Sequence, residues 1–275
     1  MLAEARRLAI LERLQRERVV EVASLSRALG VSEATIRRDL LRLEREGLVR
    51  RTHGGAVVRQ VTPTESPFAE RLMVRAQAKE AIGRLASQLV QDGDTLLIDS
   101  STTTYHFARA LRERADLQGL TVVTNDLKVA EVLDQPAASL TLLITGGELR
   151  PRTQSLVGPV AERMLAAVRM HKLFLSAMGV SIADGLTQAD LPQASVKRAM
   201  LGAAEKVILL VDSSKIGVVS THVVAPIDAV DLVVTDDGAP AGFVRELERG
   251  GKRVLRAAVG EGSPAPQESP AEAAR

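Results

Sequence analysis

Short apolar runs alternate with amphipathic segments from about residue 78 to residue 257, and this alternation restricts the fold more than any other feature of the chain. The runs predict strands at 95–98, 120–123, 140–144, 173–177, 207–211 and 232–235. The intervening segments predict helices at 105–111, 127–133, 160–167, 196–204 and 243–249. Strands that alternate with helices form a mostly parallel, doubly wound α/β sheet, whose ligands bind beyond the carboxyl ends of the strands.

The first sixty residues have a different pattern, with apolar side chains spaced three or four residues apart. They predict three helices, with stripes at Leu8, Leu11 and Leu14, at Val22, Leu25 and Leu29, and at Ile36, Leu40 and Leu43. Gly30 is suited to end the second helix in the left-handed conformation, and Ser32 is suited to cap the third. Segments 48–51 and 52–57 predict two short strands around a glycine turn. The pattern therefore predicts a winged helix-turn-helix.

These patterns divide the chain into four parts. We predict a winged helix-turn-helix domain over residues 1–57, a linker over 58–77 and a ligand-sensing α/β domain over 78–259. The linker is predicted from its Thr and Pro content. Residues 260–275 are rich in Pro, Glu and Ala, lack a hydrophobic period and are expected to be disordered.

Basic charge is concentrated at the N-terminus. Residues 1–60 contain thirteen arginines and eight acidic residues, whereas the whole chain has a net charge of only +2. Aromatic residues make up 2% of the chain, too few for the stacking platforms of single-strand binders, so any nucleic acid is expected to be duplex DNA.

The third helix and the wing carry the candidate DNA contacts. A helix in the major groove contacts bases from its N-terminal turns, which favours Ser32, Thr35, Arg37 and Arg38 for base contacts and Arg42 for phosphate. The wing adds Arg50, Arg51, His53 and Gly54. The alternative for each arginine is an ordinary solvated basic face.

The candidate ligand residues follow the strands of the second domain. Asp99, Ser100, Ser101, Thr102, Thr103 and Thr104 lie between a strand and a helix, where hydroxyls and backbone N–H groups favour a phosphate. The alternative is that the Ser and Thr side chains only cap the helix. Loops after other strands, and nearby cations, add further candidates, which are Thr124, Asn125, Gly146, Gly147, Arg152, Gly179, Lys197 and Lys215.

Composition excludes several classes of site. The chain has no Cys, hence no disulfide or thiolate site, and this agrees with a cytoplasmic location. Its four His are scattered, so neither a metal nor a cofactor is expected, and no apolar run approaches the ~18 residues of a membrane span. DNA half-sites are usually bound by symmetric pairs, so we expect a homo-oligomer, dimer or tetramer, assembled through residues 78–257.

Several motifs together resemble the DeoR family of bacterial transcriptional regulators. They include the run from Val31 to Leu40 (VSEATIRRDL), the HGGA run from His53 to Ala56, and the KEAI run from Lys79 to Ile82. Further matches are GGELR at 146–150, VGP at 157–159, KRAM at 197–200 and DSSK at 212–215, so the resemblance covers about residues 3 to 257.

This resemblance implies an N-terminal winged helix-turn-helix and a C-terminal sensor domain related in fold to ribose-5-phosphate isomerase. It also implies control by a small phosphorylated metabolite, commonly a phosphorylated sugar, and hence a repressor of carbohydrate-metabolism genes. Family members usually have Gly where this chain has Ser101 and often Glu where it has Gln193.

Two rival functions are a sugar-phosphate isomerase and a DNA-architectural protein. An isomerase needs a carboxylate base, yet this chain has Ala177-Met178-Gly179-Val180 where the related isomerases have a pair of Asp residues. An architectural protein would not need the large ligand-type domain. The sequence therefore favours a regulator that is not an enzyme.

Overall fold

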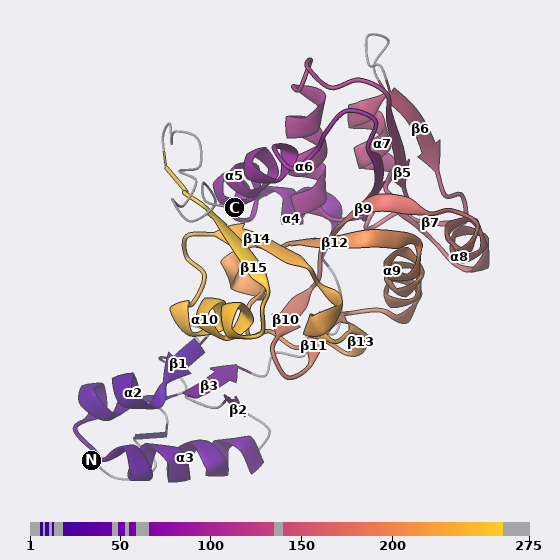
Figure 1. The fold of residues 1–275 in the computed structure, drawn as a ribbon. Coiled ribbons are helices and arrows are strands. Elements are labelled where there is room, and N and C mark those ends of the chain that lie inside the picture. The colour runs from indigo at the N-terminus through magenta and orange to yellow at the C-terminus, as the bar shows by residue number, and fades with distance from the viewer. Residues whose placement is uncertain are drawn as a thin grey trace.

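The computed structural model describes residues 6–7, 9–10, 13, 19–45, 49–52, 55–58, 66–134 and 140–260 (Figure 1). A small N-terminal domain and a larger α/β domain are each built around their own buried apolar side chains. The predicted fold class, a helix-turn-helix domain followed by a mostly parallel sheet, is confirmed.

The described part of the small domain includes helices α2 and α3 and a three-stranded antiparallel sheet, beside a few helical residues near the N-terminus. Its elements are β1 (Val19–Glu21), α2 (Val22–Leu29), α3 (Glu33–Arg45), β2 (Val49–Thr52) and β3 (Gly55–Val58), with strand order β1-β3-β2. Leu25, Ile36 and Leu40 are fully buried, as the stripes predict. Strand β1 was not predicted, because its pairing with β3 depends on contacts distant in sequence. The stripe at Leu8, Leu11 and Leu14 lies outside the described residues.

The turn between α2 and α3 has the predicted chemistry. Gly30 has φ 64°, a left-handed conformation that glycine adopts without steric cost, and its N–H donates to the carbonyl of Ser26. The Ser32 hydroxyl accepts from the N–H of Thr35 at 3.3 Å. The two predicted signals, a glycine stop and a serine cap, are both confirmed.

The large domain has a seven-stranded, fully parallel sheet with the order β15-β14-β12-β9-β4-β5-β6. Its strands are β4 (Thr95–Ile98), β5 (Leu120–Thr124), β6 (Leu140–Ile144), β9 (Met170–Leu175), β12 (Ala204–Leu210), β14 (Leu232–Asp236) and β15 (Arg253–Ala257). The chain adds β5 and β6 on one side of β4 and then returns to place β9 on the other. The strand order therefore reverses between β4 and β9, where doubly wound sheets bind their ligands.

Helices cover both faces of this sheet, and alternate strand residues pack against each layer. One layer has α5 (Ala76–Ser87), α6 (Thr102–Arg112) and α7 (Leu127–Leu133), and the other has α8 (Pro159–Ala166), α9 (Leu191–Ala203) and α10 (Ala241–Arg249) (Figure 1). In β4, Leu96 packs with the first layer and Leu97 with the second. Gly83 permits the close approach of α5 to α6, since a Cβ there would lie 2.6 Å from the carbonyl carbon of His106.

Two small antiparallel sheets and two short helical turns complete the domain. They comprise β7 (Glu148–Arg150) with β8 (Ser155–Val157), β10 (Gly179–Ser181) with β11 (Gly185–Gln188) and β13 (His222–Ala225), and the 3-10 turns Ser213–Lys215 and Ile227–Ala229. The sequence analysis predicted none of these elements, nor β15. Helix α9 begins five residues before the predicted start, because the cap at Asp190 was not recognised in the sequence. Its carboxylate accepts from the N–H of Gln193.

The predicted linker over 58–77 differs from the structure in its second half. This part contains α4 (Phe68–Met73), and α5 begins at Ala76. Phe68 is buried, its ring meets that of Tyr105 edge-on with centroids 5.5 Å apart, and its N–H donates to the carbonyl of Arg152 at 2.9 Å. The segment was assigned to the linker for its turn residues, but Phe68 fixes it to the large domain. Residues 261–275, within the predicted disordered tail, lie outside the described residues.

Candidate functional site

The exposed face of α3 carries the predicted DNA contacts. Ile36, Leu40 and Leu43 face the core, which leaves Ser32, Arg37, Arg38 and Arg42 exposed and Thr35 partly exposed. The Ser32 and Thr35 hydroxyls lie 3.0 Å apart at the start of the helix. Arg37 pairs with Glu33 one turn earlier at 3.0 Å, and both side chains are well exposed. Such an exposed pair is weak, so it leaves Arg37 available to a stronger anion.

Sequence reasoning missed an ion pair that orients α3. The carboxylate of Asp39, 6% exposed, accepts from Arg6 through Nε at 2.5 Å and Nη2 at 3.2 Å. This two-point contact joins α3 to the helical residues near the N-terminus. The only signal in the sequence was an acidic residue between two arginines and a core leucine. Of the wing residues, Arg50 and Arg51 lie in β2, while His53 and Gly54 lie outside the described residues.

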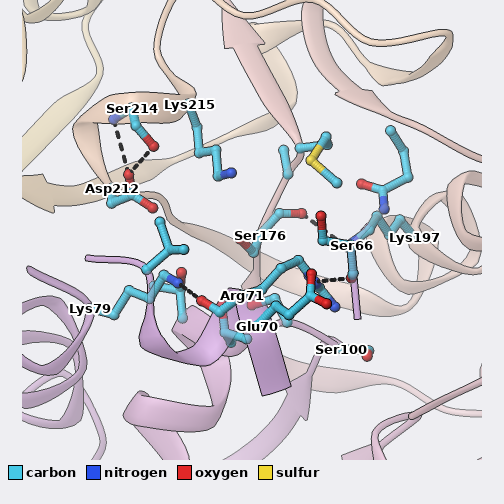
Figure 2. A pocket seen from close by; sticks show the side chains of 17 residues that line it. Ser66, Glu70, Arg71, Lys79, Ser100, Ser176, Lys197, Asp212, Ser214 and Lys215 are labelled. Carbon is cyan, nitrogen blue, oxygen red and sulfur yellow. Dashed lines mark hydrogen bonds between the residues drawn. The ribbon is translucent and has the colours of Figure 1, made fainter. Parts of the chain in front are cut away.

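A cavity of about 290 Å³ lies beyond the carboxyl ends of β4, β9 and β12, and we call it the strand-end cavity (Figure 2). The loop after β4 contributes Ser100 to Thr103, the loop after β9 contributes Ser176 to Met178, and the turn after β12 contributes Asp212, Ser214 and Lys215. The cavity therefore sits at the reversal of strand order, as expected for this type of sheet.

The hydroxyl run from Ser100 to Thr104 is divided between helix capping and the lining of the strand-end cavity. Ser101 caps α6, since its hydroxyl accepts from the N–H of Thr104 at 3.0 Å, and the Thr104 hydroxyl donates to the carbonyl of Asp99 at 2.6 Å. Ser100 donates to Asp126 at 2.7 Å, and burial raises the pKa of that carboxyl to about 6. Among the described residues, the hydroxyls of Thr102 and Thr103 have no partner, and both residues line the cavity.

Asp99 differs from its predicted role, because it does not line the cavity. Its carboxylate accepts from the ammonium of Lys197 and from the N–H of Ser176 at 3.0 Å, and both charged side chains are almost fully buried. Lys197 lines the cavity, but it lies within α9 rather than at its start, and it also donates to the carbonyl of Ser176 at 3.0 Å. A buried charge requires a partner of this kind, so Asp99 holds Lys197 in position.

A second group of cations also lines the cavity. Of its members, only Lys215 was predicted from the sequence. Arg71 and Lys79 line the cavity together with Lys215 (Figure 2). Lys79 is 4% exposed, and its ammonium donates to the carbonyl of Arg71. Burial, together with Lys215, Arg71 and Arg75, lowers the pKa of Lys79 to about 8 despite the nearby carboxylate of Asp212. An anion placed here would relieve the repulsion among these cations.

The structure places eight predicted ligand residues outside the cavity lining: Asp99, Thr104, Thr124, Asn125, Gly146, Gly147, Arg152 and Gly179. The Thr124 hydroxyl donates to the carbonyl of Ile98 at 2.7 Å, and the Asn125 amide donates to the carbonyl of Leu156 at 3.1 Å. Gly147 and Gly179 permit close backbone contacts, since a Cβ would lie 2.5 Å from the Val157 carbonyl oxygen and 2.3 Å from that of Val218. Thr124 ends β5, Asn125 follows it, and Gly146 and Gly147 follow β6; both strands lie to one side of the cavity.

Lining residues that sequence reasoning missed come mainly from segments it assigned other roles. They are Ser66, Glu70, Arg71, Val74, Lys79, Ser176, Ala177, Met178, Gln188, Asp212 and Ser214. The side chain of Gln188 lines the cavity and donates to the buried amide oxygen of Gln193, so Gln193 lies behind Gln188. Lys79 and Asp212 had a usable signal, because both belong to motifs of the resembled family.

Among the described residues that line the cavity, no carboxylate is both buried and without a partner. The two carboxylates that line it are Glu70 and Asp212, and Asp212 accepts from Ser214 and contacts Arg75. Ala177 and Met178, in the loop after β9, line the cavity without supplying a carboxylate. Abstraction of a proton beside a carbonyl requires an available base, so this arrangement favours binding without turnover.

No three His, Cys, Asp or Glu side chains in the described residues are grouped so that they could hold a metal ion. No helix in the described part of the chain is long and apolar enough to cross a membrane.

Comparison with known protein families gives two matches that cover most of the chain. Residues 6–62 match the DeoR-like helix-turn-helix domain, and residues 74–237 match the DeoR C-terminal sensor domain.

Similar proteins include three transcriptional regulators. The chain is 35% identical to HTH-type transcriptional regulator GlpR of Haloferax volcanii, over 93% of this chain and 98% of that protein. It is 32% identical to HTH-type transcriptional repressor GlcR of Bacillus subtilis, over 95% and 99% of the two chains. It is 37% identical to transcriptional repressor AccR of Agrobacterium fabrum, over 85% and 89%. Among solved structures, ribose 5-phosphate isomerase A of Methanocaldococcus jannaschii aligns with 50% of this chain and 53% of its own, at 18% identity and a TM-score of 0.37.

Proposed function

The chain belongs to the DeoR family of transcriptional regulators, and we propose that it represses carbohydrate-metabolism genes under the control of a phosphorylated sugar bound in the strand-end cavity. It is a DNA-binding regulator rather than an enzyme. The partners in this proposal are a double-stranded operator, contacted through α3 and the wing, and a small phosphorylated metabolite. A protein of this kind works where the DNA is, so we assign it to the cytoplasm.

The observation that carries the effector proposal is the convergence of cations and free hydroxyls on one cavity. Lys79 and Lys215 line it from α5 and from the turn after β12, while Thr102 and Thr103 line it at the N-terminus of α6. The first N–H groups of a helix favour an anion, and a buried ammonium adds charge to that preference. The remaining lining, which includes Ser176 and Gln188, offers hydrogen-bonding groups to a sugar.

A thermal-shift screen tests the effector proposal. The probes are glucose 6-phosphate, fructose 6-phosphate, ribose 5-phosphate and glycerol 3-phosphate, each beside its unphosphorylated parent, with inorganic phosphate as a further probe. A ligand that binds only the folded chain at one hundred times its Kd stabilises it by about 2.7 kcal/mol, which raises the Tm by several degrees. We expect at least one phosphorylated probe to raise the Tm and its parent to have no effect. Equal shifts for both members of every pair would contradict the proposal.

We also propose that the chain acts as a symmetric dimer or tetramer assembled through its sensor domain. A single helix-turn-helix module has limited affinity, and paired half-sites about 34 Å apart are matched by paired modules. Light scattering on the intact chain, free and with DNA, measures the assembly. A monomer in both conditions would contradict this part of the proposal.

Effector affinity is expected to fall as the pH rises above about 8. The pKa of Lys79 is lowered to about 8, so its ammonium, which attracts the anion, is lost above that value. A phosphate monoester has its second pKa near 6, so the ligand's own charge is nearly constant from pH 7 to 9. Calorimetric titration over that range should show Kd rising towards pH 9 in the wild type.

The matched variants are Lys79→Met, in which binding should be weak and nearly independent of pH, and Lys252→Met, which changes a lysine outside the cavity.

The stability of the ligand-free chain should rise over the pH range in which effector affinity falls. The unfolded state keeps the proton of Lys79 between pH 8 and its ordinary pKa of 10.5, so in that window this group makes stability rise with pH. A wild-type Kd that is constant from pH 7 to 9 would remove Lys79 from the ligand site.

A further inference from the structure

Residues 66–75, here called the strap, form one wall of the strand-end cavity. Ser66, Glu70, Arg71 and Val74 of the strap line the cavity, and α4 is its helix. A helix of six residues is not stable in water by itself, so contacts with the large domain determine where the strap lies. The strap is also the first described segment after the small domain. Seven residues separate Ser66 from Val58, the last residue of β3. Movement of the strap therefore moves the attachment point of the DNA-binding domain.

Arg75 fixes the end of the strap. Its backbone has φ 55°, a left-handed conformation that is uncommon for a residue other than glycine. Nη2 of Arg75 donates to Asp236 at 2.8 Å and to the hydroxyl of Ser213 at 2.8 Å, and Nε lies 3.3 Å from the carboxylate of Asp212. Both carboxylates are almost fully buried, so the guanidinium binds two charges that cannot move far.

Asp212 connects Arg75 to the cavity. The same carboxylate oxygen that lies near Arg75 Nε also accepts from the N–H of Ser214 at 3.0 Å and from the Ser214 hydroxyl. Asp212, Ser214 and Lys215 all line the cavity, whereas Arg75 does not. A ligand that contacts this turn from the cavity side therefore acts on the carboxylate that Arg75 contacts from the other side.

A second contact ties the strap to the cavity through Lys79. Its buried ammonium lines the cavity and donates to the carbonyl of Arg71, in the last turn of α4 (Figure 2). Carbonyls at a helix C-terminus have no partner within the helix and attract a cation. An anion in the cavity would compete with this carbonyl for the same ammonium, so binding would act on the strap at two points.

We propose that Arg75 is a positioning residue that transmits occupancy of the strand-end cavity to the strap, and through the strap to the DNA-binding domain. A bound phosphate group reorients Lys79, Lys215 and the turn after β12, and Arg75 carries this change through Asp212 to the end of α4. The inference rests on the proposed function, since it requires an anionic ligand in the cavity. Because Arg75 does not line the cavity, its guanidinium serves coupling and not ligand binding.

Arg75→Gly separates coupling from binding. Glycine adopts a positive φ without strain, so the variant keeps the backbone conformation and loses only the guanidinium. The matched control is Gln154→Gly, which relieves the same kind of strain at φ 61°, outside the strap and the cavity. The measurements on the full chain are Kd for inorganic phosphate and for the most effective sugar phosphate of the thermal-shift panel. Operator affinity, with and without that sugar phosphate, is measured on a duplex selected from a random-sequence library.

Coupling between two sites typically changes affinity by 5- to 150-fold. We expect a change in that range for the wild type and Gln154→Gly, and less than 2-fold for Arg75→Gly. The ligand Kd and the ligand-free operator Kd of Gln154→Gly and Arg75→Gly should both stay within about 3-fold of the wild-type values. Arg75→Lys, which can still reach a carboxylate, should restore part of the coupling. Tyr105→Ala, which loosens the strap at Phe68, supplies a second variant and should also lose coupling.

Two results would overturn this inference. One is full coupling in Arg75→Gly, whatever the result for Tyr105→Ala, and the other is loss of ligand binding in Arg75→Gly, which would make Arg75 part of the binding site. Failure of the proposed function gives a different result. In that case the wild type binds neither inorganic phosphate nor any sugar phosphate of the panel, and the inference fails with it.

Discussion

Arg38→Ala is expected to weaken binding to the operator by about 1 to 3 kcal/mol, roughly 5- to 150-fold, and to relax the sequence preference at one base pair. Arg38 is exposed in the second turn of α3, close to the Ser32 cap, where a helix in the major groove contacts base edges. A bidentate contact from arginine to guanine contributes about that much discrimination. Competition between the selected operator and random duplexes, followed by fluorescence anisotropy, measures both quantities.

Arg42→Ala provides the matched comparison, because it removes the same side chain one turn farther along the exposed face of α3. We expect it to weaken binding to specific and random duplexes alike. The slope of log affinity against log salt should fall by about 1, the contribution of a single phosphate contact. Unchanged affinity in both variants would remove α3 from the DNA interface. Equal loss on both duplexes for Arg38→Ala would reassign that residue to phosphate contact.

Thr102→Glu is expected to abolish the response to the effector while operator binding persists. Thr102 is the first residue of α6, is 4% exposed and lines the strand-end cavity. A carboxylate there would occupy the helix N-terminus with a fixed negative charge, where we propose that phosphate binds. The regulator would then stay on its operator at every effector concentration, because a ligand that no longer binds cannot shift the equilibrium between conformations.

The measurement is operator binding by fluorescence anisotropy across an effector titration, with circular dichroism to establish that the variant is folded. Val160→Glu is the matched control, since it adds the same charge in the first turn of α8, at an exposed position outside the cavity. Thr102→Val removes only the hydroxyl and should give an intermediate loss. A folded Thr102→Glu chain that releases DNA at the wild-type effector concentration would leave the hydroxyl run with the capping role that Ser101 already has.

Local signals accounted for the elements that the sequence predicted well. The glycine stop at Gly30, the serine cap at Ser32 and the stripe at Ile36, Leu40 and Leu43 act within a few residues of one another, so they define α2 and α3 without any distant contact. The sheet was predicted for a similar reason. Strands buried on both faces are nearly continuous apolar runs, and such runs are visible in the sequence.

The candidate ligand site was predicted less completely, because the strand order decides which loops meet. Loops after β4, β9 and β12 line the cavity, since these three strands are neighbours in the sheet. Asn125 and Gly146 also follow strands, but β5 and β6 lie on the other side of β4. The apolar pattern predicts strands but not their order in the sheet, so all these loops were predicted to converge.

Buried charges show a second limit of sequence analysis. Asp99 and Lys197 are 98 residues apart, and both were proposed as ligand contacts because each follows or opens a predicted element. In the folded chain they form a buried ion pair, and only Lys197 lines the cavity. Arg71 and Lys79 were not predicted to line the cavity, because a tertiary contact brings them there. They meet because Phe68 packs α4 against the large domain, a tertiary contact within a stretch whose composition indicates a linker.

The short connection between Val58 and Ser66 has a consequence for the spacing of the operator. Eight residue steps, fully extended, reach about 27 Å, less than one turn of B-DNA at about 34 Å. In a dimer of this chain, each recognition helix is therefore tethered close to its own sensor domain. Insertion of half a helical turn between two half-sites would place the second on the opposite face of the duplex, beyond such a tether. Helical phase, as well as base sequence, would then decide which sites this regulator occupies.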